Sequence, residues 1–137
     1  MMGVLLGFDF GLRRIGIATG QGLTDTASPL MAIKARDGIP DWDALERLIT
    51  EWMPSALVVG LPLNMDGSDS EMSARARKFA NRLHGRFGLP VHLADERLST
   101  HEARAITGYR GRAGDQDGTL DAAAAACILE RWLKEST

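Results

Sequence analysis

The sequence predicts an α/β fold built on a mixed five-stranded sheet with flanking helices. Two observations lead to this fold class. Three short apolar runs follow one another near the N-terminus, as in an antiparallel meander. Later in the chain, apolar runs alternate with amphipathic segments, and each helical crossover favours a parallel partner strand. Because the chain has 137 residues and no internal repeat, we expect a single domain over residues 1–137.

The three N-terminal runs define the predicted meander. Residues 4–10 are apolar on both faces, which is typical of a strand inside a sheet. Turn residues at 11–14 separate this strand from a second one over 15–19. A third run over 29–35 continues the meander.

Two helices are predicted from the signals at their N-termini. Asp43 with Glu46 three residues later resembles a capping box, and Ser68 with Glu71 resembles a second one. Apolar residues then recur at helical spacing after both signals. The remaining predicted elements are strands over 56–60 and 91–94, a short helix after Ser99 and a last helix over 119–134.

The composition excludes several classes of protein. No apolar run reaches the roughly 18 to 20 residues that cross a bilayer, and the first residues lack the basic segment of a signal peptide, so we expect a cytoplasmic protein. The single cysteine, Cys127, excludes an internal disulfide and a cysteine-rich zinc site. Carboxylates remain as the abundant candidate ligands, so a bound metal would be a hard cation.

Three acids stand where separate predicted elements end or begin. Asp9 lies in a strand that looks internal, where a buried carboxylate is unfavourable unless it is paired or bound to a metal. Glu96 follows the fifth strand, and Asp121 begins a helix whose alanines at 122–126 allow close packing on the sheet. If the three acids converge at one sheet edge, they suit Mg²⁺ or Mn²⁺, and such a site would hydrolyse a phosphodiester.

Each of these acids also has a structural interpretation. Asp9 would form an ion pair with Arg13 or Arg14. Glu96 would be a solvated loop residue, as acids before a capping serine commonly are. Asp121 would be favoured in the first turn of its helix by the helix dipole.

Basic residues gather between positions 75 and 112. That segment holds nine basic and three acidic side chains, whereas the whole chain has a net charge of −2. On the second helix, Arg75, Lys78, Arg82 and Arg86 share a stripe that favours contact with phosphate, with a solvated face as the alternative. Tyr109 lies in a glycine-bearing basic loop and would stack on an unpaired base or belong to a surface loop. The candidate nucleic-acid contacts are Arg14, Arg75, Lys78, Arg82, Arg97, Tyr109, Arg110 and Arg112.

Four segments, in this order, resemble the YqgF-type family of Holliday-junction-resolvase-like proteins. They are residues 7–18, residues 59–68, residues 95–100, and Asp121 with its alanine-rich helix. The resemblance covers nearly the full length and implies a ribonuclease-H-like fold, with Asp9, Glu96 and Asp121 at the positions of the family's metal-binding acids. It further implies a nuclease that uses Mg²⁺ or Mn²⁺ and processes the 5′ end of pre-16S rRNA during ribosome biogenesis.

Departures from the family pattern leave other functions open. Junction resolvases carry an acid at the end of the fourth strand, where this chain has Leu61 and Pro62, so a resolvase of branched DNA is the weaker alternative. Asp115 and Asp117 stand shortly before the last acid and would weaken the attraction for phosphate there. A non-catalytic RNA-binding ribosome-assembly factor is a further alternative. The segment 9–11 also resembles the phosphate-binding segment of actin-like ATPases, which need two such domains, so this chain would have to form a homodimer.

Overall fold

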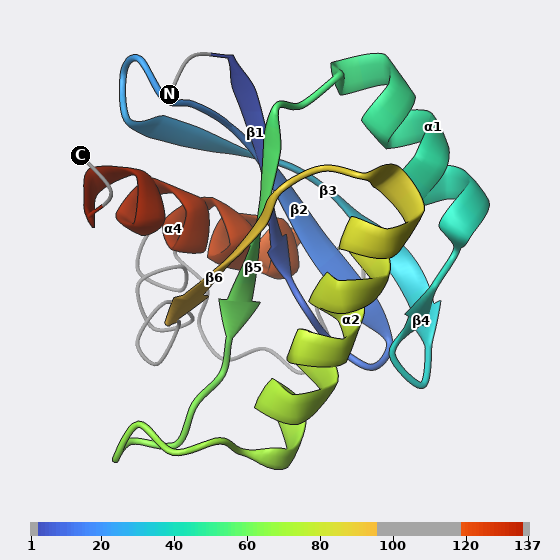
Figure 1. The fold of residues 1–137 in the computed structure, drawn as a ribbon, viewed down its shortest axis with the longest axis vertical. Helices are drawn as coiled ribbons and strands as arrows, with labels where there is room; N and C mark the ends of the chain where they lie inside the picture. The colour runs from blue at the N-terminus through green and yellow to red at the C-terminus, as the bar shows by residue number, and fades with distance from the viewer. Residues whose placement is uncertain (1–2, 96–118, 136–137) are drawn as a thin grey trace.

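A mixed β-sheet forms the centre of the molecule in the computed structural model, which describes residues 3–95 and 119–135 (Figure 1). Within these residues the sheet has six strands in the order β4-β3-β2-β1-β5-β6. The strands are β1 (Val4–Asp9), β2 (Arg14–Gln21), β3 (Thr26–Arg36), β4 (Ile39–Pro40), β5 (Ala56–Leu61) and β6 (Val91–Asp95). Because β1 pairs antiparallel with β2 and parallel with β5, the prediction of a mixed sheet is confirmed.

The sheet has one strand more than the five that the sequence predicted. The additional strand, β4, pairs antiparallel with the end of β3 across a tight turn. Asp37 and Gly38 form this turn, with φ angles of 51° and 82°. A strand of two residues is too short for a hydrophobic alternation to indicate it.

The third strand is longer than predicted and contains an irregularity. On the neighbouring strand β2, Ile17 pairs with Met31 of β3, whereas the next residue, Ala18, pairs with Pro29 of β3. The strand β3 therefore carries one extra residue at this point. Such a bulge accommodates a proline, which has no N–H to donate to the sheet. The predicted strand covered residues 29–35, whereas the observed strand runs over Thr26–Arg36.

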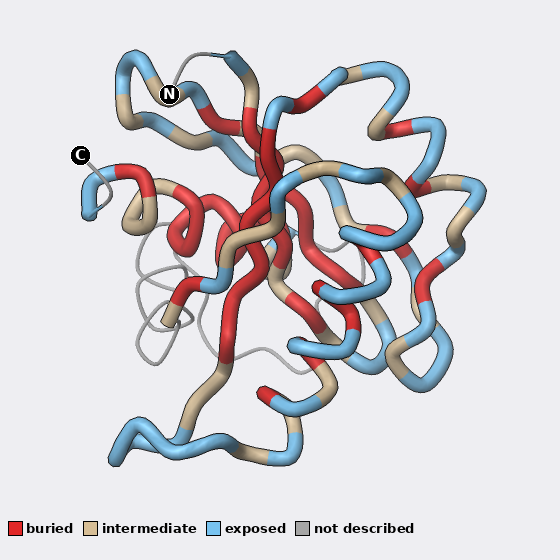
Figure 2. Tube along the Cα trace, viewed as in Figure 1, coloured by how far each residue is buried: buried red, intermediate tan, exposed pale blue. Residues whose placement is uncertain are grey.

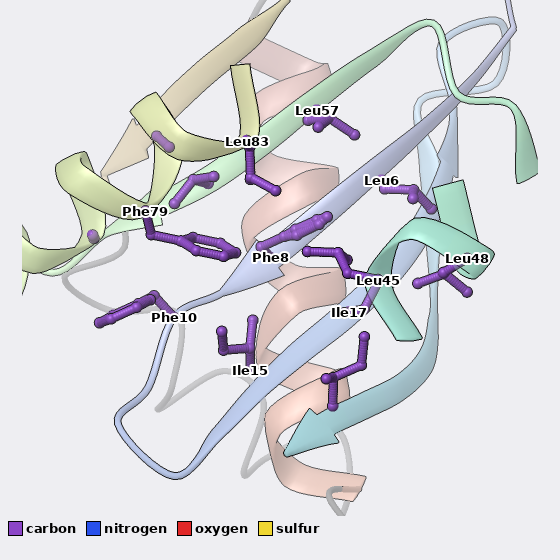
Figure 3. Packing of buried hydrophobic residues seen from close by; sticks show 14 of the residues in the cluster. Leu6, Phe8, Phe10, Ile15, Ile17, Leu45, Leu48, Leu57, Phe79 and Leu83 are labelled. Atoms are coloured by element: carbon purple, nitrogen blue, oxygen red, sulfur yellow. The ribbon is translucent and has the colours of Figure 1, made fainter. Parts of the chain in front are cut away.

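Two helices cover one face of the sheet and a third covers the other (Figure 1). The helices α1 (Trp42–Trp52) and α2 (Glu71–Phe87) pack on the face that carries Leu6 and Phe8. Phe79 of α2 lies with its ring centroid 5.8 Å from that of Phe8 and 5.4 Å from that of Phe10 (Figure 3). The strand β5 is buried along its whole length between the layers (Figure 2).

Both predicted helix starts are displaced by two residues. The N-cap of α1 is Asp41, whose carboxylate accepts from the N–H of Ala44 at 3.2 Å, and not Asp43. The N-cap of α2 is Ser70, which forms its capping box with Ser73 and not with a glutamate. Ser68 instead donates to the carboxylate of Asp66 at 2.6 Å within the preceding loop, so its hydroxyl is engaged elsewhere.

The helix α4 (Thr119–Glu135) packs on the opposite face of the sheet. Glycines of β1 and β2 make this approach close, because a Cβ on Gly7 or Gly20 would lie 2.7 Å from the side chain of Leu129. The five alanines at 122–126 are all buried, with Ala125 and Ala126 in the cluster against the sheet and Ala123 and Ala124 in a separate cluster with Cys127. Within residues 3–95 and 119–135, none of the helices combines the length and the apolar character needed to cross a membrane.

Candidate active site at the end of strand β1

Asp9 is the last residue of the central strand β1. Its neighbours across the sheet are Gly16 of β2, which is its register partner, and the end of β5 on the other side. Alternation along the strand places Asp9 on the same face as Leu5 and Gly7, which is the face that α4 covers. The side chain is half-buried, so a carboxylate stands at the boundary between the core and the sheet edge.

Asp121 reaches this position from the opposite end of the sequence. The backbone of Asp121 touches Gly16 so closely that a Cβ at Gly16 would overlap the carbonyl group of Asp121 and would lie 2.9 Å from the N atom of Ala122. Gly16 is therefore the common neighbour of both acids, paired with Asp9 along the ladder and in contact with Asp121 through the helix. The structure brings these two predicted acids to one place.

An ion pair holds the Asp121 side chain. The Nε atom of Arg14 lies 3.1 Å from Oδ2 of Asp121, and both side chains are 30% exposed. Arg14 begins β2, two residues before Gly16, so the strand that contacts the helix backbone also supplies the cation for its carboxylate. From the sequence, Arg14 is a candidate partner for Asp9 and a candidate nucleic-acid contact, and the structure adds Asp121 as its ion-pair partner.

The third predicted acid follows the strand β6. Because β1, β5 and β6 are parallel, their carboxyl ends meet at one edge of the sheet, where open α/β folds bind ligands. Asp95, the last residue of β6, pairs with Leu61 of β5. Glu96 comes next in the chain and lies outside the described residues. The same holds for the other predicted contacts in this segment, which are Arg97, Tyr109, Arg110 and Arg112.

The donor chemistry at this edge fits a hard divalent cation. Asp9 and Asp121 offer carboxylate oxygens, which Mg²⁺ and Mn²⁺ prefer and which commonly hold such an ion together with substrate phosphate. Among the described residues, no group of three or more His, Cys, Asp or Glu side chains is placed to hold a metal ion. A site with three protein ligands would therefore need a ligand from outside the described residues, where the predicted acid Glu96 lies, in addition to the two acids that meet at Gly16.

The basic stripe of α2 divides between two environments. Arg75, Lys78 and Arg82 line one groove beside the turn between β3 and β4. Arg86, further along the same stripe, instead lies over the ring of Trp42 at 4.2 Å from its centroid, as in a cation–π contact. Only the first three cations are thus grouped at one surface.

Asp37 and Ile39, which line the same groove, are not among the candidate residues predicted from the sequence. The pair Asp37-Gly38 is a strong hairpin signal and could have indicated the turn. No pattern in the sequence indicates that this turn faces α2, because that contact depends on the order of strands in the sheet.

Comparison with known proteins supports a single family. The chain matches the family model described as "RuvX: Holliday junction resolvase" over residues 3–135. A protein of Azotobacter vinelandii, named as a candidate pre-16S rRNA nuclease, is 58% identical over 136 residues, which cover 96% of this chain and 94% of that protein. A protein of Escherichia coli O157:H7 with the same name is 55% identical over 139 residues, covering 98% of this chain and 99% of that protein.

Solved structures of junction resolvases share the fold. RuvC of Thermus thermophilus in complex with a Holliday junction substrate aligns with a TM-score of 0.53 at 19% identity, covering 99% of this chain and 96% of that one. The fowlpox virus resolvase in complex with Holliday junction DNA aligns with a TM-score of 0.59 at 14% identity, covering 97% and 98%. These alignments confirm the ribonuclease-H-like fold, and the match of the family model over residues 3–135 shows that the chain belongs to the RuvX family of Holliday-junction-resolvase-like proteins.

Proposed function

We propose that this chain is a single-domain, metal-dependent nuclease that hydrolyses phosphodiester bonds in the 5′-end processing of pre-16S rRNA. The observation that carries the proposal is the meeting of Asp9 and Asp121 at Gly16, on the edge of the sheet where the parallel strands end. The names of the relatives supply the RNA substrate. Ribosomal RNA is made in the bacterial cytoplasm, and we expect the chain to act there.

In this proposal Asp9, Glu96 and Asp121 hold Mg²⁺ or Mn²⁺. Such an ion supplies a water of lowered pKa and neutralises charge on the phosphodiester. Arg14 forms an ion pair with the carboxylate of Asp121, and this cation competes with the metal ion for that carboxylate. Arg97, Tyr109, Arg110 and Arg112 are proposed to contact the nucleic acid, as are the cations of α2. All three acids come from one chain, so cleavage does not require the homodimer considered from the sequence.

The alternative of a resolvase acting on branched DNA is less well supported. The solved neighbours act on junctions, but they share only the fold with this chain. At the end of β5, where we expect resolvases to carry an additional acid, Leu61 is 6% exposed and packs in the core. This position therefore offers no fourth carboxylate.

The test compares cleavage by the parent chain and by Asp9→Asn. The substrates are an RNA that carries the 5′ leader of 16S rRNA and a four-way DNA junction, each with Mn²⁺ and with a chelator. We expect the parent to cleave the RNA only with metal and Asp9→Asn to lose at least about 100-fold in rate. The variant should melt at or above the parent temperature, because two carboxylates that share a metal-free site repel each other. Asp43→Asn, which removes an exposed acid of α1, is the matched control.

Each other outcome has a definite meaning. Full cleavage by purified Asp9→Asn would refute the assignment of this acid. A lower melting temperature for that variant would support the structural ion pair instead. Cleavage of the DNA junction alone would replace the proposed function by the resolvase, and RNA binding without metal-dependent cleavage would replace it by the assembly factor.

A further inference from the structure

A groove of about 300 Å³ lies between α2 and the turn that joins β3 to β4. We call it the α2 groove and define it by Arg75, Lys78, Arg82, Phe10, Asp37 and Ile39. It is separate from the pair of acids at Gly16 and lies on the opposite face of the sheet, the one that α2 covers, but Phe10, which lines it, directly follows Asp9, so the groove and the acids lie at the same end of β1. In Figure 1 the turn next to β4 and the connection between β1 and β2 lie at the same end of the sheet, beside α2.

The two sides of the α2 groove differ in chemistry. Three cations line the side formed by α2. The opposite side carries Ile39, which is 50% exposed, and next to the turn Leu12 is 37% exposed. The rings of Phe10 and Phe79 close the bottom and are nearly fully buried. A ligand in this groove would therefore meet positive charge on one side and apolar carbon on the other.

Asp37 forms an ion pair with one of the three cations, Arg75. Its carboxylate accepts from Nη1 of Arg75 at 3.4 Å, with the two side chains 76% and 39% exposed, respectively. An ion pair this exposed contributes little to stability, so another anion can replace the carboxylate without loss of fold. A phosphate group is suited to that exchange, because a guanidinium binds its oxygens as it binds those of a carboxylate.

We infer that the α2 groove binds one unpaired nucleotide of the RNA strand that leads to the acids. The phosphate lies against Arg75, Lys78 and Arg82 in place of the Asp37 carboxylate, and the base packs against Ile39. Cations alone would suit a duplex equally well, but a duplex keeps the faces of its bases stacked and offers no base face to Ile39. The volume of the groove is within the range of small-molecule sites and suits a unit of this size. This inference deepens the proposed function and rests on it for the identity of the strand.

The test measures binding without cleavage. Fluorescence anisotropy would follow a labelled single-stranded RNA and a duplex of the same sequence, in chelator, at several salt concentrations. Ile39→Ser should weaken binding of the single strand about fivefold or more and leave the duplex unchanged, because apolar contact with a base exists only in the single strand. Leu23→Ser is the matched control, since Leu23 is 74% exposed at the far turn between β2 and β3 and should change neither affinity.

Two charge variants test the phosphate contact. Lys78→Gln should lower the slope of log affinity against log salt by about 0.7, as expected for one lost phosphate contact on a single strand. Asp37→Asn should strengthen binding, because it frees Arg75, whereas Asp43→Asn on α1 should have little effect. Lys78 and Asp37 both have exposed side chains, and thermal melting verifies that the two variants are folded.

The inference is overturned if Ile39→Ser binds the single strand like the parent, or if it weakens the duplex to the same extent. An unchanged salt slope for Lys78→Gln also overturns it. If the variants behave as expected but the parent cleaves no RNA with metal, the nucleotide site stands and the proposed nuclease fails.

Discussion

Substitution of Gly16 by alanine is the most direct probe of the candidate site. Gly16 has no positive φ angle, so the chain needs glycine here for space and not for backbone conformation. A methyl group at this position would overlap the carbonyl of Asp121 and lie 2.9 Å from the N atom of Ala122. These are backbone atoms of a helix, and they cannot move aside as the end of a side chain can.

The size of the effect follows from this overlap. Carbon atoms pack at roughly 3.5 to 4.0 Å, so the first turn of α4 would have to move away from β2 by about 1 Å or more. Overpacking of this kind destabilises by about 2 kcal/mol, which corresponds to a melting temperature about 8 °C lower in a domain of this size. Because a shift of about 1 Å at a catalytic group can reduce a rate 100-fold, we expect cleavage to fall by about that factor in Gly16→Ala.

Two other glycines provide matched controls for the thermal melts and the RNA cleavage assay. At Gly20 an added methyl group meets the side chains of Leu129 and Leu133, which can shift, so Gly20→Ala should lose less stability and keep most of its activity. Gly85, in the exposed part of α2, has no other atom within 4 Å of an added Cβ. Gly85→Ala should raise stability by about 0.5 to 1 kcal/mol, because alanine favours a helix over glycine.

The comparison among the three variants decides the matter. If Gly16→Ala melts and cleaves like the parent, the close contact between β2 and α4 does not exist in solution. If Gly20→Ala loses as much activity as Gly16→Ala at equal stability, the loss comes from loosened packing and not from displacement of Asp121.

Two further predictions concern the surroundings of the site and of α2. Arg14→Gln should lower the Mn²⁺ concentration for half-maximal binding about fivefold, because it removes from Asp121 a competing cation whose ion pair is worth about 1 kcal/mol. Arg13→Gln, at the exposed neighbouring residue, should leave this concentration unchanged. Calorimetric titration measures Mn²⁺ binding by both variants, and equal values would refute the role of the ion pair. Ser73→Ala should lower the free energy of unfolding by about 1 kcal/mol in urea melts, because the buried hydroxyl of Ser73 completes the capping box of α2. Ser68→Ala, in the exposed loop, should change the free energy of unfolding by less. A larger effect of Ser68→Ala than of Ser73→Ala would contradict the cap assignment.

Long elements with a strong pattern could be predicted from the sequence alone. The strands β1 and β5 read as apolar runs because both of their faces are covered by helices. The helix α4, described over Thr119–Glu135, covers the predicted helix over 119–134, and its alanines correctly indicated close packing on the sheet. In such segments local preference and burial favour the same structure.

Details that depend on competition between neighbouring groups could not be predicted. Two serines precede α2, and the pattern of a serine followed by a glutamate favours Ser68 over Ser70. The choice is made by the loop, which already engages Ser68 with Asp66 and leaves Ser70 to cap the helix with Ser73. A sequence pattern contains no information on which hydroxyl is already bonded.

The candidate site was predictable in part for a similar reason. That Asp9 stands at a strand end and Asp121 at a helix start follows from the local pattern. That Gly16 joins them requires the register of β2 against β1 and the position of α4, which only the folded chain specifies. The ion pair of Arg14 with Asp121 depends on the same placement.

The contact between Gly16 and the start of α4 also has a consequence for the moment at which the site is completed during synthesis. Domains emerge from the ribosome N-terminal end first, so Asp9 and the strands of the sheet are made well before residues 119–135. Until α4 docks, the apolar face around Leu5 and Val58 lacks this helix, and Asp121 is not beside Asp9. Docking of α4 and assembly of the pair of Asp9 and Asp121 are therefore the same event, and a nascent chain that ends before Thr119 would lack Asp121 and with it this acid pair.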